Sequence, residues 1–375
     1  MDRRGHWIAQ LAVGWAGLAV AALLVSTAWW VVMERVPIGS LSALRWDRML
    51  LARARVVEAA SPPRPKPSSP ALALPRGMVL GYFYDPGDPA GSLQFLRRYQ
   101  GVLSGLIPFW YTVAANGAVS GTAQANVLQW ARRHHLWVFA LVGSQDAQAL
   151  DALLQDPAAE ARATAEILAL CQKEGFGGIN LDWEGIAPDD RQALSTFVAH
   201  LAQTLHHYGY LLTLSLPAET KDAPADSWTG AYDYRALGQA ADLVMVMAYD
   251  QHWSGGPPGP IASPSWVRQV LSYAISVIPP AKVILGVPGY GYDWSGNGSA
   301  VALSYPQAVA LEKQFDPKSR GNHFVYIENG TVHSVWFEDT ASFLSKIGLV
   351  TGYELRGIAL WRLGIEDPRI WDFLQ

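Results

Sequence analysis

Three polar side chains stand at alternate positions in an apolar stretch near the middle of the chain. The segment GFGGINLDWEGI, residues 175–186, contains Asn180, Asp182 and Glu184, each separated from the next by an apolar residue. Residues two apart in a β-strand share a face, and their Cα atoms lie about 6.6 Å apart. A charge on Asp182 then raises the pKa of Glu184, as a general acid requires. The alternative is a polar interior layer that only satisfies its own hydrogen bonds, but burying two acids for that purpose is costly.

The elements around this segment alternate between two kinds of pattern. Helical stretches, in which apolar residues recur every three or four positions, cover residues 158–173, 190–207, 266–277 and 340–353. Eight apolar, strand-like runs cover residues 78–83, 103–113, 136–143, 177–184, 211–218, 242–250, 282–292 and 357–364. The alternation predicts an α/β fold, a (β/α)8 TIM barrel, rather than a doubly wound sheet, because no glycine-rich phosphate turn is present. In such a barrel the three polar residues point inward at the carboxyl end, where barrel enzymes place their chemistry.

The stretch between the seventh and eighth strands is too long for a simple loop. It contains HFVYIENGTVHSVWFED, which has the pattern of a hairpin around Asn329 and Gly330. We therefore expect a small α+β insertion over residues 300–339.

The first 76 residues differ in character from the rest. Residues 7–33 contain no Asp, Glu, Lys or Arg, and this run is long enough to cross a hydrocarbon layer of about 30 Å. We expect a single-pass membrane anchor over residues 1–33, a basic stalk and proline-rich linker over residues 34–76, and the barrel over residues 77–375. A cleaved signal peptide is the competing interpretation, in which the catalytic domain is secreted.

Composition excludes several classes of function. Residues 1–76 hold 10 Lys and Arg against 4 Asp and Glu, which leaves 18 against 28 for the remainder, and an excess of acid argues against nucleic acid as a partner. One cysteine, Cys171, rules out a disulfide framework and a multi-cysteine metal site. No cofactor motif is present, and adjacent histidines such as His134 and His135 cannot chelate a metal from one helix face. We therefore expect no cofactor and no metal.

Several motifs together resemble one known family. GGINLDWE is similar to the DGxDxDxE signature of family 18 glycoside hydrolases, the chitinase-like enzymes, and Asn180 at the middle acid resembles their spore-germination, peptidoglycan-hydrolysing branch. Further similar stretches follow in the expected order, and the resemblance spans about residues 78–375: IPFWYTV (107–113), WTGAYDY (228–234), MAYDQHWSGGPPGP (247–260), GVPGYGYDW (286–294), VWFEDTASF (335–343) and LRGIALWRLG (355–364).

The resemblance implies a role for each matching residue. Glu184 would protonate the glycosidic oxygen, and Asp182 would orient the N-acetyl group, whose oxygen serves as the nucleophile with retention of configuration. Tyr249 would hydrogen-bond the acetamido carbonyl. Asp250 would bind a sugar hydroxyl or act near Tyr249, and Trp361 would form the floor beneath the reacting sugar.

Aromatic residues at or just after the predicted strand ends are candidates for stacking on sugar rings. Trp110 and Trp361 are the strongest of them, although ordinary packing is an alternative for each ring. The candidate substrate-binding residues are Asn180, Asp250, Trp110, Tyr111, Trp361 and Tyr290, and Trp253, Tyr292 and Trp294 share the same placement.

The signature departs from the family pattern at two positions. Gly177 replaces its first acid and Asn180 its middle one, so the chain of groups beneath Asp182 is shortened. We expect a membrane-anchored, extracytoplasmic hydrolase of β-1,4 bonds in N-acetylglucosamine polymers such as peptidoglycan or chitin. The alternative is a catalytically silent, chitinase-like module that only binds such a polymer.

Overall fold

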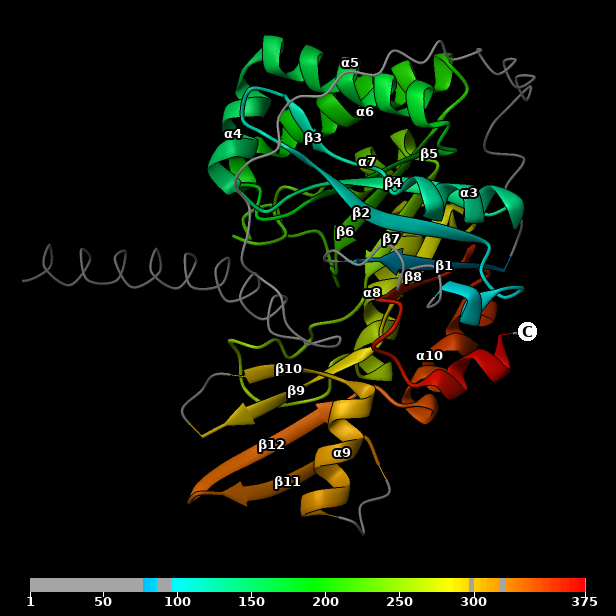
Figure 1. Cartoon of the computed structure of the whole chain (residues 1–375). Helices are drawn as coiled ribbons and strands as arrows, with labels where there is room; N and C mark the ends of the chain where they lie inside the picture. Colours follow the sequence, from blue (N-terminus) through cyan, green and yellow to red (C-terminus); the bar gives the residue numbers. More distant parts are fainter. Residues whose placement is uncertain (1–76, 86–95, 297–299, 317–320, 375) are drawn as a thin grey trace, which may run out of the picture. The chain divides into compact units, whose positions relative to one another are not determined.

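The computed structural model describes residues 77–85, 96–296, 300–316 and 321–374 (Figure 1). The candidate anchor over residues 7–33 and the proline-rich linker lie outside these ranges. Within them, no helix combines the length and the apolar character needed to cross a membrane.

Eight parallel strands form a closed barrel, as the alternating pattern predicts. In chain order they are β1 (Met78–Phe83), β2 (Gly105–Val113), β4 (Trp137–Ser144), β5 (Gly178–Trp183), β6 (Leu211–Pro217), β7 (Leu243–Met247), β8 (Val283–Pro288) and β13 (Gly357–Trp361). Each strand pairs with the next, and β13 pairs with β1 to close the ring. Most are buried on both faces, which explains their nearly continuous apolar sequences.

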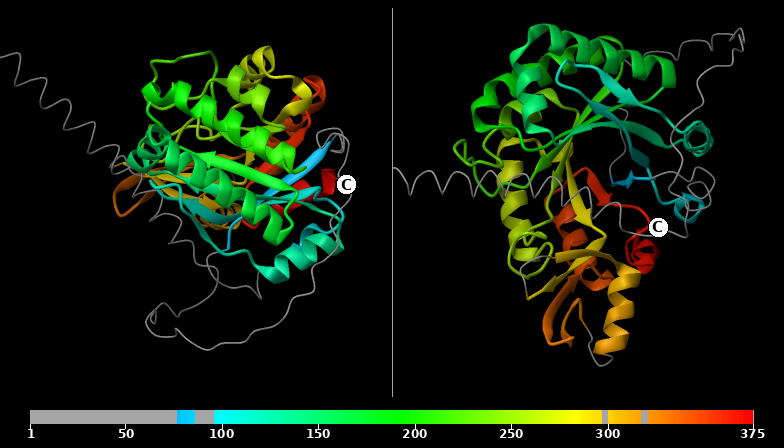
Figure 2. Two further views of the ribbon diagram at one scale, coloured as in Figure 1. Left: turned by 90° about the horizontal axis from the view of Figure 1, so that it is seen from above. Right: turned by 60° about the vertical axis from the view of Figure 1, so that its left-hand side comes forward.

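Helices cover the outside of the barrel (Figures 1 and 2). The longest, α5, begins where the Asp156 side chain accepts a hydrogen bond from the Ala158 amide and ends at Gly175, whose φ of 66° favours glycine. The helices of the described chain are α3 (Ala125–Arg133), α4 (Ala147–Gln155), α5 (Pro157–Glu174), α6 (Arg191–His207), α7 (Tyr234–Ala240), α8 (Pro264–Val277), α9 (Tyr305–Phe315) and α10 (Thr340–Gly352), with short 3-10 turns η2 (Arg97–Tyr99), η3 (Pro188–Asp190), η4 (Pro280–Lys282) and η5 (Pro368–Phe373).

An antiparallel sheet is inserted between β8 and β13. Its strand order is β10 (Ala300–Ser304), β9 (Tyr290–Ser295), β12 (Thr331–Phe337) and β11 (His323–Glu328), and α9 packs on it (Figure 1). The hairpin prediction is confirmed, because Glu328 pairs with Thr331 across Asn329 and Gly330, which have φ of 51° and 78°.

The prediction of one strand over residues 282–292 was wrong. The run forms two strands, β8 in the barrel and β9 in the inserted sheet, and they separate at Gly289. A Cβ atom at Gly289 would lie 3.0 Å from the Cβ atom of Glu366, so a larger residue at this change of sheet would require Glu366 to shift.

Candidate active site

The alternation along β5 places its polar residues inside the barrel. Asn180 is fully buried and Asp182 is 7% exposed, while Glu184 follows the strand at its carboxyl end. Trp183 points the other way, and its ring stacks on Phe197 of α6 at 4.9 Å. The inward stack predicted from the sequence is therefore present.

Asn180 belongs to a neutral hydrogen-bond network beneath the acids. Its Nδ2 donates to Thr213 Oγ1 at 3.1 Å, and its Oδ1 accepts from Ser215 Oγ at 2.9 Å. Because the Ser215 hydroxyl donates its hydrogen to Asn180, its oxygen accepts the hydrogen bond from the Tyr82 hydroxyl, at 2.6 Å. Thr213 in turn donates to the Ile179 carbonyl. The position therefore needs both a donor and an acceptor, which an amide supplies without charge.

Gly177, the other departure from the acidic signature, does not belong to this stack. Gly177 lies three residues before Asn180, so the two positions face opposite sides of an extended chain. A Cβ atom on Gly177 would lie 2.6 Å from the Trp137 ring. The expectation that Gly177 shortens the chain of groups beneath Asp182 was therefore wrong, and only Asn180 does so.

Asp182 is a buried carboxyl with spare bonding capacity. Its Oδ1 has no hydrogen-bond partner among the residues that the structure describes. Loss of hydration on burial, followed by the charge of Glu184, raises the pKa of Asp182 well above its usual range. A buried oxygen left unsatisfied is costly unless a ligand completes it, so this atom is available to a substrate donor.

Glu184 stands above Asp182 at the mouth of the barrel. Burial raises its pKa, and the charge of Asp250 acts in the same direction. The opposing influence is Gln145, at the end of β4, whose Nε2 donates to Glu184 Oε1 at 3.0 Å. A raised pKa favours the protonated form of Glu184, which is the form that a general acid uses.

Tyr249 and Asp250 follow β7 at the same edge. Tyr249 is 8% exposed, and burial, followed by the nearby Tyr82, Asp182 and Glu184, raises its pKa so that it stays a hydroxyl donor. Asp250 has a left-handed backbone, with φ of 57°, a conformation that is uncommon for residues other than glycine and is found at functional sites.

The Asp250 carboxylate is held by two tyrosines from the inserted sheet. Tyr290 donates to its Oδ1 at 2.5 Å and Tyr292 donates to the same atom at 3.0 Å. Burial raises the pKa of Asp250 to about 6, and the two hydrogen bonds oppose that rise. Tyr290, a candidate substrate-binding residue, therefore holds the side chain of Asp250 in place.

Trp361 closes the site from the opposite wall. It ends β13, which is four strands from β5 in either direction around the ring. Its ring meets that of Tyr82 edge to face at 5.2 Å, and Tyr82 is in turn close enough to Asp182 for that charge to act on its hydroxyl. Tyr82 thus links Trp361 to the carboxylates.

The structure does not bring Trp110 and Tyr111 to the carboxylates. Each ring contacts Phe176, with centroids 6.2 Å apart, and Phe176 lies before β5, at the end opposite Glu184. The register of β2 shifts between Phe109 and Tyr111, and the strand continues into a hairpin with β3 (Val119–Gly121). The two rings therefore pack at the amino end of β5.

Sequence reasoning missed Tyr82, Ser215 and Gln145. The first two lie at inward positions near the ends of β1 and β6, so the alternation used for β5 could have found them. Gln145 is an exposed residue in a loop, and no pattern marks it.

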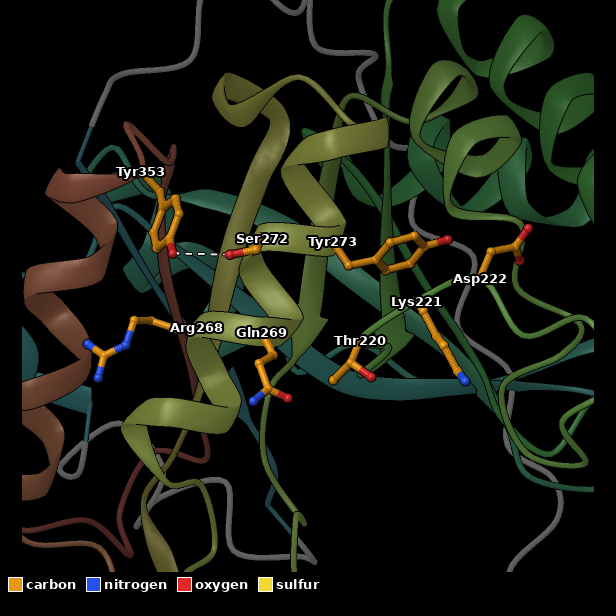
Figure 3. A pocket seen from close by; sticks show the side chains of 8 residues that line it. All are labelled: Thr220, Lys221, Asp222, Arg268, Gln269, Ser272, Tyr273 and Tyr353. Carbon is orange, nitrogen blue, oxygen red and sulfur yellow. Dashed lines mark hydrogen bonds between the residues drawn. The ribbon is translucent and has the colours of Figure 1, made fainter.

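A groove of about 680 Å³ lies elsewhere, beside α8 and the end of α10 (Figure 3). Tyr353 and Ser272, which line it, are linked hydroxyl to hydroxyl at 3.2 Å. None of the candidate site residues lines this groove. Across the described ranges, no group of three His, Cys, Asp or Glu side chains is arranged to hold a metal ion.

Comparison with known proteins agrees with this geometry. The family model described as glycosyl hydrolases family 18 matches residues 107–366. The cortical fragment-lytic enzyme of Bacillus cereus is 36% identical over 244 residues, which cover 62% of this chain and 56% of that enzyme.

Two solved structures are similar as well. The Bacillus cereus spore cortex-lytic enzyme SleL matches with a TM-score of 0.73 and 29% identity, over 83% of this chain and 75% of that one. A chitinase from Chromobacterium violaceum ATCC 12472 matches with a TM-score of 0.73 and 31% identity, over 80% of this chain and 98% of that one.

Proposed function

Because the chain belongs to glycosyl hydrolases family 18, a family of glycosidases, we propose that it cleaves β-1,4 bonds in peptidoglycan, including that of spore cortex. One observation carries the proposal: Glu184, with a raised pKa, stands at the barrel mouth above Asp182, whose buried Oδ1 has no partner in the described chain. Glu184 can donate a proton, and Asp182, two residues earlier in the chain, can accept a hydrogen bond from an N–H group.

The first step uses Glu184 as the acid. It transfers its proton to the glycosidic oxygen while the bond from that oxygen to the anomeric carbon breaks, and the leaving sugar departs as an alcohol. The acetamido oxygen of the reacting sugar attacks the same carbon and forms an oxazolinium ring, so no second carboxylate is needed as the nucleophile.

Asp182 and Tyr249 position that acetamido group. Asp182 Oδ1 accepts its N–H, which satisfies the unpaired atom and aims the acetamido oxygen at the anomeric carbon. The Tyr249 hydroxyl donates to the acetamido carbonyl, and Trp361 supports the opposite face of the ring. Two attacks on the same carbon, first by the acetamido oxygen and then by water, retain its configuration, with Glu184 taking the proton from water in the second.

The choice of peptidoglycan rests on the relatives. Those with 36% and 29% identity carry names that refer to lysis of spore cortex, whereas the structure similar at 31% is that of a chitinase. The chain spans 56% of the cortical fragment-lytic enzyme, so its substrate is carried over as part of the proposal.

We further propose that residues 7–33 hold the barrel at the outer face of the cell membrane. The 27-residue run without charged residues supports this, and the polymer is found outside the cytoplasm. Membrane fractions washed with carbonate would retain an anchored chain and release a secreted one, whose shortened N-terminus mass spectrometry would identify.

The test of catalysis is digestion of purified peptidoglycan by the full chain beside its Glu184→Gln variant. We expect N-acetylglucosamine reducing ends from the wild type and a loss of about 10²–10⁴-fold in rate for the variant, because general acid catalysis contributes that much. Binding of the polymer by both proteins, with products from neither, would instead establish the silent binding module.

A further inference from the structure

An exposed tryptophan stands beside the proposed general acid. Trp228, in the loop between β6 and α7, is 47% exposed. A Cβ atom placed on Gly185 would lie 3.9 Å from Cζ3 of the Trp228 ring, and Gly185 directly follows Glu184. An exposed indole next to a catalytic carboxyl is a surface on which a flat apolar face of a substrate can lie.

The loop that carries Trp228 is held by its own hydrogen bonds. Asp226 Oδ1 accepts from the Trp228 amide at 2.9 Å and from the Thr229 amide at 2.8 Å. Arg191 donates to the Gly230 carbonyl at 2.8 Å. A platform that is already ordered loses little conformational entropy when a ligand binds to it.

A second bond ties this loop to the strand that carries the carboxylates. The Tyr232 hydroxyl donates to the carbonyl of Trp183, the residue before Glu184, at 2.8 Å. The loop therefore keeps a fixed position relative to Glu184.

The order of strands in the barrel indicates on which side of the cleaved bond the Trp228 ring lies. Trp361, on β13, lies across the barrel from β5, whereas the Trp228 loop leaves β6, the neighbour of β5. In the proposed mechanism Trp361 supports the reacting sugar, and Glu184 stands between that sugar and the leaving group. Trp228 therefore borders the proposed site on the side away from Trp361, which is where this mechanism places the leaving group.

We propose that Trp228 stacks on a sugar ring of the polymer on the leaving-group side of the cleaved bond. The ligand is a pyranose whose axial C–H groups form an apolar face, and the indole covers that face. This inference rests on the proposed hydrolysis and adds to it a site that favours long chains over short ones.

Two substrates separate this role from a general loss of activity. Peptidoglycan places sugars on both sides of the cleaved bond, whereas a 4-nitrophenyl glycoside of the N-acetylglucosamine disaccharide has only an aryl group on the leaving side. For Trp228→Ala in the full chain we expect kcat/KM to fall about tenfold on the polymer, which corresponds to about 1.4 kcal/mol, and to change less than about twofold on the aryl glycoside.

A matched control is available at the other end of the barrel. Tyr208, which is 46% exposed and follows α6 before β6 begins, is an equally exposed aromatic residue on the opposite side from Glu184. Tyr208→Ala should leave kcat/KM unchanged on both substrates. Equal losses on both substrates for Trp228→Ala, or no loss on the polymer, would overturn the proposal.

Binding measured without turnover keeps this inference distinct from the proposed reaction. In a Glu184→Gln background, a soluble N-acetylglucosamine oligomer that extends past the cleaved bond should bind about tenfold more weakly when Trp228 is also replaced by alanine. A wild type that cleaves neither substrate would count against the proposed hydrolysis, whereas an active wild type with unchanged binding in this background would count against Trp228 alone. Circular dichroism of each variant establishes that the fold is retained.

Discussion

Replacing Gln145 is expected to move the alkaline limb of the pH–rate profile to higher pH. Its Nε2 donates to Glu184 Oε1 at 3.0 Å and stabilises the ionised form of that carboxyl, which lowers the pKa of Glu184. The proposed acid works only while it is protonated, so activity falls as pH rises through this pKa. Without the hydrogen bond the proton is held to higher pH.

The size of the shift follows from the strength of that hydrogen bond. A hydrogen bond to a charged group contributes about 1.5–3 kcal/mol, and because Gln145 is exposed, water recovers roughly half of it. One pKa unit corresponds to about 1.36 kcal/mol, so Gln145→Ala should shift the limb upward by about 0.5–1 unit. One unit above the wild-type midpoint, the variant would then hold up to about five times as much protonated Glu184.

The assay is kcat/KM against pH with the aryl glycoside, because this profile reports the ionisations of the free enzyme. Gln155→Ala is the matched control, since Gln155 makes a similar contact, 2.7 Å to Asp190, away from the site. A limb that stays in place or moves to lower pH in Gln145→Ala would refute the assignment of Glu184 as the acid tuned by this contact.

Two predictions concern stability. Lys346 and Glu338 form an ion pair in which both side chains are buried, so Lys346→Ala should lower the free energy of unfolding in urea by about 3–5 kcal/mol, and a loss below about 1 kcal/mol would contradict this. Glu219 is 4% exposed, and burial raises its pKa from 4.5 to about 8. Between these two pH values the folded state holds a proton that the unfolded chain releases. The free energy of unfolding therefore falls as pH rises from 4.5 to about 8. Glu219→Gln should match the wild type at pH 5 and exceed its unfolding free energy by roughly 1–3 kcal/mol at pH 9, and a variant no more stable at pH 9 would exclude this account.

The barrel and the carboxylate stack could be predicted from the sequence because both depend on short-range periodicity. Residues two apart in an extended segment share a face. The side chains of Asn180 and Asp182 on β5, and of Glu184 directly after it, therefore lie on one face once the strand forms. Tyr249 lies two residues after the end of β7, at the same edge of the ring, so the strand pattern also places it near these carboxylates.

Placements that depend on irregular backbone could not be predicted. Trp110 and Tyr111 follow a strand-like pattern, yet β2 shifts register beside them and both rings pack against Phe176. Gln145 reaches Glu184 from a loop after β4, and no periodicity marks a loop residue. Trp228 lies near Gly185 in a turn that Asp226 holds by hydrogen bonds, and no sequence periodicity marks such a loop position.

Strand β9 serves two structures at once, and this limits how the insertion can evolve. One face sends Tyr290 and Tyr292 to Asp250 in the barrel, while Asp293, on the other face, accepts hydrogen bonds from Tyr326 and His333 of the insertion. A lineage that adapts to a new polymer by exchanging the insertion as a block would lose the support of Asp250. Selection is therefore free to vary the outer strands and α9, but it must conserve the alternation of β9.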